Sequence, residues 1–181
     1  MGRTSRRRYD KAELTFAPIS HFAPGALADI LRRSYAGLVA EDPAHWGQED
    51  QSWEDFDRQA FAHPHTIGSC VFVSRLEKEQ VGLASFDPRP RPRHGLIGQN
   101  CILPEFRSRG FGKEQIFEVL RRFRRWGIGT ALVATSAHPF FLPARRMYES
   151  LGFREIRRFP GGPDPRYGII ELVRTLDPAR G

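Results

Sequence analysis

The feature that most constrains the fold is an apolar strand that leads through a glycine-rich turn directly into a helix. The strand is predicted over 96–103, the turn over 105–113, and the helix from there to a stop at Gly127. A second apolar strand is predicted over 130–135. This order directs the free N–H groups at the start of the helix beyond the end of the first strand, where they form a natural anion site.

The spacing of the turn residues excludes two known kinds of anion-binding loop. A Walker loop needs a glycine five places before Gly112 and Ser or Thr after the lysine, but the chain has Arg107 and Glu114 there. A dinucleotide-binding turn needs a third glycine at the position of Gln115. The pattern that remains is Arg107-x-x-Gly110-x-Gly112.

A second motif lies between Pro143 and Phe153. It predicts a short helix with Ala144, Met147, Tyr148 and Leu151 on one face, followed by Gly152-Phe153. With both motifs, the sequence resembles the GNAT superfamily of acetyl-CoA-dependent N-acetyltransferases. That family's pyrophosphate loop reads [Arg/Gln]-x-x-Gly-x-[Gly/Ala], and a later helix reads Ala-x-x-[Leu/Phe/Met]-Tyr before Gly-Phe. The motifs support the resemblance over 80–176, and the first eighty residues match in element order.

The resemblance implies an α/β fold of the mixed α+β kind. We expect a single GNAT-like domain over 11–177, preceded by a basic, flexible N-terminus at 1–10. The domain would have a twisted mixed sheet of six to seven strands flanked by about four helices. Its two central parallel strands, 96–103 and 130–135, would splay apart at their C-terminal ends.

The resemblance also implies that acetyl-CoA binds as a co-substrate in the gap between these strands. The pantetheine would pair with the main chain of Cys101, Ile102 and Leu103. The pyrophosphate would rest on the N–H groups of the turn, whose residues are Arg107, Ser108, Arg109, Gly110, Phe111, Gly112 and Lys113. The two glycines of the motif allow close approach of the backbone, which a Cβ would block.

The implied chemistry is attack of a neutral amine on the thioester carbonyl, with coenzyme A leaving as a thiolate. Such a transfer needs a donor to the oxyanion and an acid for the sulfur. By family position, Tyr148 supplies the acid, and a backbone N–H within 101–103 supplies the oxyanion contact. The alternative for Tyr148 is a core aromatic with a local hydrogen-bond partner. Phe141 stands where the family often has Asn, so that side-chain contact to the pantetheine is not implied.

The residues do not identify a general base. The candidates are Asp87, His94 and His138, and His138 ranks first because it follows the strand near the expected entry of the acceptor. Gly98, Gln99 and Asn100 cannot act as bases, although the segment can hold a water. None of the six histidines forms a zinc set, so we expect no metal.

The acceptor is predicted from an acidic and aromatic stretch. Seven of the 21 carboxylates lie within 41–57, together with Trp46 and Trp53 and with no Lys or Arg. Such a wall attracts cations, which favours a small cationic amine as the acceptor. The alternative is a solvated loop followed by a helix from Trp53, in which Ser52 and Asp55 form a capping box.

Three functional classes therefore stay open. They are an N-acetyltransferase for a small amine, an N-acetyltransferase for a protein or peptide, and a non-catalytic acyl-CoA-binding or regulatory domain. The net charge is +7 and the pI is about 10.1, but the basic residues are mostly arginines spread along the chain. This distribution argues against nucleic acid as the main partner.

The composition also bounds the location of the protein. No stretch approaches the roughly 18 apolar residues of a membrane span, and the N-terminus lacks the apolar region of a secretory signal. Cys70 and Cys101 do not form a disulfide framework. We expect a cytoplasmic protein without a membrane partner, and leave a homodimer open.

Overall fold

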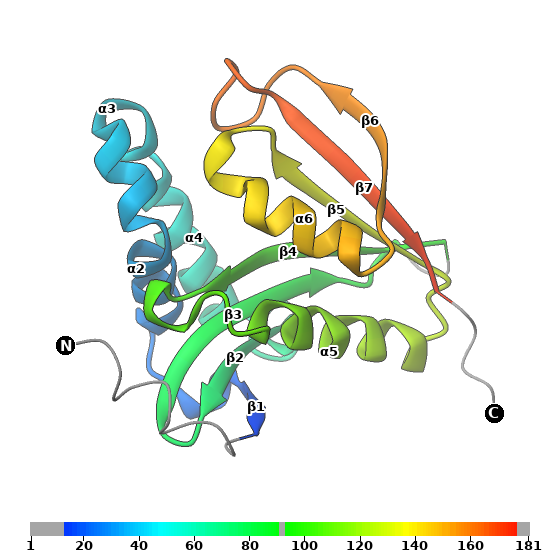
Figure 1. Cartoon of the computed structure of the whole chain (residues 1–181). Coiled ribbons are helices and arrows are strands. Elements are labelled where there is room, and N and C mark those ends of the chain that lie inside the picture. The colour runs from blue at the N-terminus through cyan, green and yellow to red at the C-terminus, as the bar shows by residue number, and fades with distance from the viewer. Residues whose placement is uncertain (1–12, 91–92, 177–181) are drawn as a thin grey trace.

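Seven strands form one mixed sheet in the order β1-β2-β3-β4-β5-β7-β6 (Figure 1). The computed structural model describes residues 13–90 and 93–176. The strands are β1 (Leu14–Pro18), β2 (Val71–Leu76), β3 (Glu79–Asp87), β4 (Gly95–Ile102), β5 (Thr130–Ser136), β6 (Arg154–Phe159) and β7 (Ile169–Thr175). The predicted sheet of six to seven strands is confirmed, and the N-terminus at 1–10 lies outside the described residues.

Helices cover both faces of the sheet. They are α2 (Ala26–Glu41), the one-turn α3 (Pro43–Trp46), α4 (Glu49–Ala62), α5 (Phe111–Arg125) and α6 (Leu142–Ser150), with short 3₁₀ turns at Ile19–His21, Gly68–Cys70, Pro104–Phe106 and Pro139–Phe141. Because side chains alternate along a strand, β2 contributes side chains to two hydrophobic cores, one on each face of the sheet. Val71 and Val73 pack with Leu31 of α2, whereas Phe72 packs with Phe123 of α5 on the other face. This confirms a single domain with about four longer helices.

The two central strands separate as predicted. β4 and β5 run parallel and pair through Gly95–Ile97 and Ala131–Val133. Along the described chain this pairing does not extend to 98–102, although residues 100–102 of β4 continue to pair with β3. A break in the β3–β4 register marks the point of separation, where Ser85 Oγ accepts from the N–H of Gln99 at 2.8 Å. One edge of β4 is therefore open next to the start of α5.

The acidic stretch folds differently from the predicted loop. α2 continues to Glu41, and α4 already begins at Glu49 rather than at Trp53. Ser52 therefore lies inside α4, so the predicted capping box with Asp55 is wrong. The physical reason is that Glu49 and its neighbour already place carboxylates in the first turn, where they stabilise the helix dipole.

Two other carboxylates of this stretch cap helices. Asp42 begins α3, and its Oδ1 accepts from the N–H of His45 at 3.2 Å. Asp57 is buried, and its two oxygens accept from the N–H groups of Gly25 at 2.7 Å and Leu27 at 2.9 Å. Asp57 thus holds the start of α2 against α4.

The described residues contain neither a membrane-spanning helix nor a cluster of metal ligands. Across residues 13–90 and 93–176, no helix is both long and apolar enough to cross a membrane. Within the same residues, no three His, Cys, Asp or Glu side chains gather as a metal site would require.

Candidate active site

A cavity of about 370 Å³ lies where the end of β4, the start of α5 and α6 meet. Most of the residues expected at the cofactor line it, namely Cys101, Ile102, Arg107, Ser108, Gly110, Phe111, Gly112 and Lys113. Leu103 and Arg109 do not. Leu103 is buried, and its N–H donates to the carbonyl of Val81 at 2.8 Å. The Arg109 guanidinium lies over the rings of Phe106 and Phe111.

The start of α5 forms one wall of this cavity. Gly110 caps the helix with φ +88°, a left-handed conformation that favours glycine. A Cβ at Gly112 would lie 3.1 Å from the sulfur of Met147 on α6. The N–H groups of Lys113 and Glu114 donate to the carbonyl of Gly110, whereas the N–H groups of Phe111 and Gly112 have no acceptor in the preceding turn and can bind an anion in the cavity.

Arg107 fixes the turn before this helix. Its Nε donates to the carbonyl of Ile102 at 2.9 Å, and its Nη2 donates to the carbonyl of Ser34 on α2. The guanidinium also lies 5.6 Å from the ring centre of Phe140. The side chain of Arg107 is thus used within the protein, and the other groups at this turn that could bind an anion are backbone N–H groups and the ammonium of Lys113.

The backbone of β4 offers groups toward the open edge. In an antiparallel pair, successive residues direct their N–H and C=O groups alternately toward and away from the partner strand. Since Leu103 N–H faces β3, the N–H groups of Ile102 and Asn100 face the side from which β5 has diverged. Those two positions, rather than Leu103, present main-chain donors to the gap.

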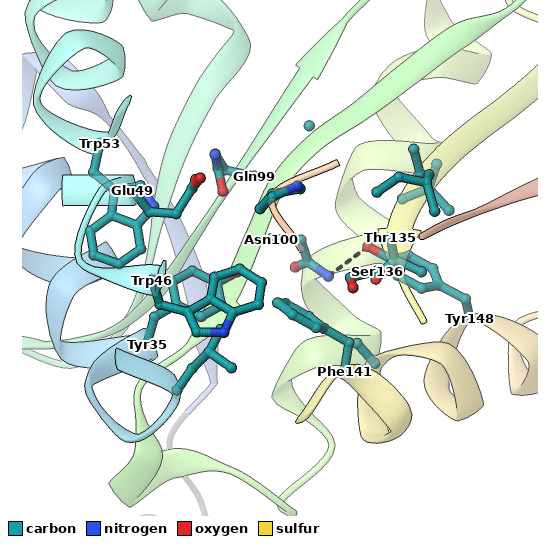
Figure 2. A pocket seen from close by; sticks show the side chains of 17 residues that line it. Tyr35, Trp46, Glu49, Trp53, Gln99, Asn100, Thr135, Ser136, Phe141 and Tyr148 are labelled. Carbon is teal, nitrogen blue, oxygen red and sulfur yellow. Dashed lines mark hydrogen bonds between the residues drawn. The ribbon is translucent and has the colours of Figure 1, made fainter. Parts of the chain in front are cut away.

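A second cavity of about 220 Å³ adjoins the first (Figure 2). The cavities share Tyr35 of α2, Asn100 of β4, and Phe141 and Ala144 at the start of α6. The second cavity extends from these residues to Tyr148 and the end of β5. A ligand in one cavity can therefore reach a ligand in the other, which is the geometry that a group transfer requires.

Aromatic rings and one carboxylate line the far side of the second cavity. Trp46, Glu49 and Trp53 all contribute, and the ring of Tyr35 stacks on Trp53 with 5.6 Å between centres. Among the described lining residues, Glu49 is the carboxylate. Two other acids of the stretch, Asp50 and Glu54, pair instead with Arg32.

Tyr148 lies on the wall nearest the cofactor cavity. It is almost fully buried, and its hydroxyl oxygen accepts a hydrogen bond from Asn100 Nδ2 at 2.9 Å. Burial raises the pKa of Tyr148, and the bond from Asn100 lowers it by a smaller amount. The phenol is thus protonated at neutral pH, and its own O–H remains available to another acceptor.

The three candidate bases lie outside both cavities as far as the described lining residues show. His138 packs on Trp46 and Tyr167 and caps the turn before α6, because its Nδ1 accepts from the N–H of Phe140 at 3.1 Å. Asp87 is paired with Arg89, whose hydrogen bond lowers the pKa of that carboxyl. His94 precedes β4 at its opposite end. We therefore carry none of the three into the proposed reaction.

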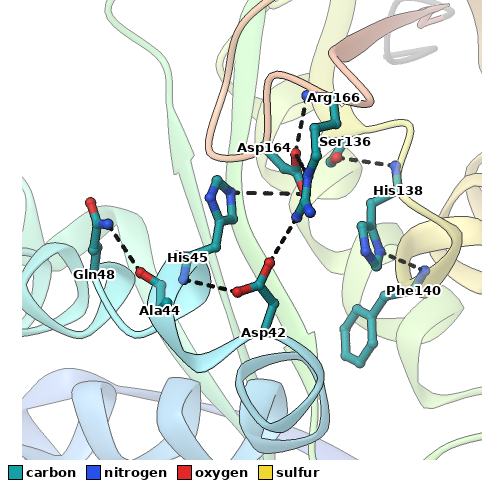
Figure 3. Close-up of polar contacts among 9 residues, drawn as sticks. All are labelled: Asp42, Ala44, His45, Gln48, Ser136, His138, Phe140, Asp164 and Arg166. Atoms are coloured by element: carbon teal, nitrogen blue, oxygen red, sulfur yellow. Dashed lines mark hydrogen bonds and ion pairs between the residues drawn. The ribbon is translucent and has the colours of Figure 1, made fainter.

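The loop between β6 and β7 forms part of the wall of the second cavity. Pro163 lines the cavity, and Arg166 ties this loop to the start of α3 (Figure 3). Its Nη2 donates to Asp42 at 3.0 Å and to Asp164 at 2.7 Å. His45 Nε2 lies 3.8 Å from Asp164, so the two segments meet at several polar contacts.

Several lining residues had no functional signal in the sequence. Tyr35 fits the apolar face of a helix and was indistinguishable from a core residue. Phe141 stands where the family often has Asn, which implies no contact to the cofactor, yet it lines both cavities. Glu49 was one acid among seven, and only the fold separates it from the others.

These features define an acetyltransferase of the GNAT type, with acetyl-CoA as co-substrate. A model of the acetyltransferase (GNAT) family matches residues 26–153, and the chain belongs to that family. No curated protein matches the sequence at a significant level.

Solved structures share the fold at low sequence identity. A GNAT-family protein from Desulfovibrio desulfuricans is 17% identical with a TM-score of 0.69, over 90% of this chain and 99% of that chain. yncA of Salmonella typhimurium, solved with its cofactor acetyl-CoA, is 18% identical with a TM-score of 0.68, over 95% and 98%. The ribosomal-protein-S18-alanine N-acetyltransferase of Escherichia coli is 18% identical with a TM-score of 0.55, over 67% and 77%.

Proposed function

We propose that the protein transfers the acetyl group of acetyl-CoA to the nitrogen of a small cationic amine. The observation that carries this proposal is the second cavity, where Glu49 and the indoles of Trp46 and Trp53 lie opposite Tyr148. Carboxylates and aromatic faces both attract ammonium groups. We call this space the acceptor cavity, and the larger one the cofactor cavity.

Residues of this chain suit the cofactor that the family uses. The first turn of α5 and Lys113 would hold the pyrophosphate, while the open edge of β4 would hold the amide groups of the pantetheine arm. Bound there, acetyl-CoA supplies an activated acetyl thioester. The N–H groups of Asn100 and Ile102 would then stabilise negative charge on the reacting carbonyl oxygen.

Glu49 and Tyr148 would have separate roles in proton transfer, the first as base and the second as acid. An alkylammonium has an ordinary pKa near 10.4, so the acceptor arrives charged and must lose a proton before it attacks. Glu49 would bind the ammonium and take that proton, directly or through a water held by Gln99. Tyr148 would donate its proton to the departing sulfur, because its hydroxyl is protonated and its oxygen already accepts from Asn100. The second proton, which the attacking nitrogen loses as the amide forms, would restore the phenol.

The volume of the acceptor cavity favours a small molecule. About 220 Å³ is below the roughly 300–1,000 Å³ typical of pockets for drug-sized ligands. The loop carrying Pro163 further limits the space above the cavity. A protein acceptor would have to present a single amino-terminal residue or lysine side chain through this opening.

The test is a panel of acceptors with acetyl-CoA, followed by mass spectrometry of the products. It contains small diamines, amines with no second charge, and peptides with free amino termini. The proposal expects kcat/KM to be highest for the small cationic amines. Higher kcat/KM for peptides would assign the protein-acetylating class, and tight acetyl-CoA binding without any product would assign the non-catalytic class.

A further inference from the structure

A continuous chain of buried hydrogen bonds runs behind Tyr148. The Ser74 hydroxyl donates to Gln115 Oε1 at 2.5 Å, and Gln115 Nε2 donates to Asn100 Oδ1 at 2.6 Å. Asn100 Nδ2 then donates to the hydroxyl oxygen of Tyr148 at 2.9 Å. The chain joins β2, α5, β4 and α6 through side chains that lie between 15 and 48 residues apart in the sequence.

The directions of these bonds follow from one main-chain group. Gln115 is fully buried and lies 2.7 Å from the carbonyl of Leu83, which can only accept. The nitrogen of the Gln115 amide must therefore face Leu83, and a second carbonyl, that of Cys101, also lies 3.4 Å from this nitrogen. Its second hydrogen is directed mainly to the nearer acceptor, Asn100 Oδ1 at 2.6 Å. The nitrogen of the Asn100 amide must then face Tyr148.

We infer that Gln115 is a positioning residue that sets the direction in which Tyr148 gives its proton, an inference that rests on the proposed function. The oxygen of Tyr148 accepts from Asn100 Nδ2, so the O–H of Tyr148 does not donate to Asn100. It stays directed to an acceptor in the cavity that Tyr148 lines. The bond from Asn100 also stabilises the phenolate left after proton transfer.

The choice of glutamine is informative because the position suits an apolar residue. Gln115 lies on the face of α5 that packs on the sheet, next to Ile116 and Val119 of the core. A buried amide costs free energy unless all its groups are bonded. Here its donors and its acceptor are bonded, and the bonds lead to the proposed acid.

The first experiment uses one isosteric substitution to reverse the direction of the hydrogen bond between residue 100 and Tyr148. In Asn100→Asp the carboxylate can accept from Gln115 but cannot donate to Tyr148, so the O–H of Tyr148 donates its hydrogen bond to the new carboxylate instead of to the cavity. We expect kcat for acetyl transfer to fall as far as in Tyr148→Phe, by about 100-fold, the scale of a lost general acid. The Kd for acetyl-CoA should stay within about twofold of the wild-type value.

The second experiment removes the positioning residue in a double-mutant cycle. We expect Gln115→Leu to lower kcat about tenfold in the wild-type background and to have no further effect in Tyr148→Phe, because Gln115 acts through Tyr148. Glu118→Gln is the matched control on the same helix. It removes a buried carboxylate paired with Arg121 and Arg122, and its kcat should equal that of the wild type.

A third measurement does not depend on turnover. The ¹³Cζ chemical shift of Tyr148, assigned by its loss in Tyr148→Phe, reports the hydrogen bonding of the phenol oxygen. It should move in Gln115→Leu and stay in place in Glu118→Gln.

Two outcomes would overturn the inference. One is equal loss of kcat from Gln115→Leu in both backgrounds, and the other is an unmoved ¹³Cζ shift. If the wild-type protein acetylates no amine, the proposed function fails, and the ¹³Cζ shift alone decides whether Gln115 orients Tyr148.

Discussion

Arg166 reaches Asp42 across 124 residues of sequence, with 3.0 Å between Nη2 and Oδ2. The contact joins the loop before β7 to the start of α3, and each segment contributes a wall of the acceptor cavity, Pro163 from the loop and Trp46 from α3. This side of the cavity thus depends on a polar contact between two segments that are far apart in the sequence. This relationship leads to the first prediction.

Arg166→Gln should loosen the loop and enlarge the opening of the acceptor cavity. We expect KM for a working amine to rise severalfold, while the Kd for acetyl-CoA is unchanged because no described residue of this loop lines the cofactor cavity. Steady-state kinetics and calorimetry measure the two quantities. Arg158→Gln removes an exposed pair with Glu155 on β6 and is the control, so an equal rise in KM there would contradict the prediction.

The same arginine makes stability depend on pH. Its hydrogen bond lowers the pKa of Asp164 from 3.8 to about 2. A carboxyl with a lowered folded-state pKa stabilises the fold above its ordinary pKa and loses that contribution as the pH falls toward the folded value. Urea unfolding should therefore show wild type more stable than Arg166→Gln above pH 4, with the difference shrinking between pH 4 and 2. A difference that stays constant over this range would exclude the linkage.

Gly112→Val should weaken acetyl-CoA binding at least tenfold, about 1.4 kcal/mol. The new side chain would meet Met147 and occupy the wall of the cofactor cavity. Gly110→Val should do the same and also strain the backbone at φ +88°. Gly129→Ala is the control, because nothing lies within 4 Å of the added Cβ. Calorimetry showing wild-type affinity in a folded Gly112→Val protein would disprove the role of this turn.

Tyr148→Phe should leave the Kd for acetyl-CoA unchanged and lower kcat by about 100-fold or more. The ring keeps its edge contact with Phe153, whose centre lies 5.3 Å away. Asn100 Nδ2 loses its acceptor, so the free energy of unfolding should fall by about 1 kcal/mol. Equal turnover of the two proteins would return Tyr148 to the role of a core aromatic.

Glu49→Gln should raise KM for a cationic amine and reduce the dependence of KM on salt. The reason is that Glu49 is the carboxylate among the described residues of the acceptor cavity. Glu54→Gln lies on the same helix but removes a carboxylate that pairs with Arg32, so its KM should match wild type. If the two variants behave alike at low salt, the charge of Glu49 does not select the acceptor.

The C-terminal part of the fold was predictable because its signals are local. Gly110 and Gly112 sit in a turn whose backbone needs them, and the strand, turn and helix around them are consecutive in sequence. The splayed strands and the cofactor cavity follow from this unit. The strand predicted over 96–103 differs from the observed β4 by one residue at each end.

The acceptor side was less predictable because its geometry depends on long-range contacts. Asp42 and Glu49 begin successive helices, and only the packing of those helices directs Glu49 to the cavity while Asp50 turns to Arg32. His138 follows the expected strand but is not among the described lining residues of either cavity, because its imidazole caps the next turn and packs on Trp46. In the sequence, Gln115 only departs from a dinucleotide-binding glycine pattern. Its four hydrogen-bond partners are distant in sequence, and only the folded structure brings them together.

The divergence of β4 from β5 creates a strand edge inside the protein. Exposed strand edges usually invite pairing with other chains and lead to aggregation. Here α2 and α6 flank the edge at 98–102, so their side chains restrict access to something narrow and extended. An edge flanked in this way selects ligands by their width. A narrow molecule that carries amide groups can pair with the edge of β4, whereas a second protein strand is too wide to do so.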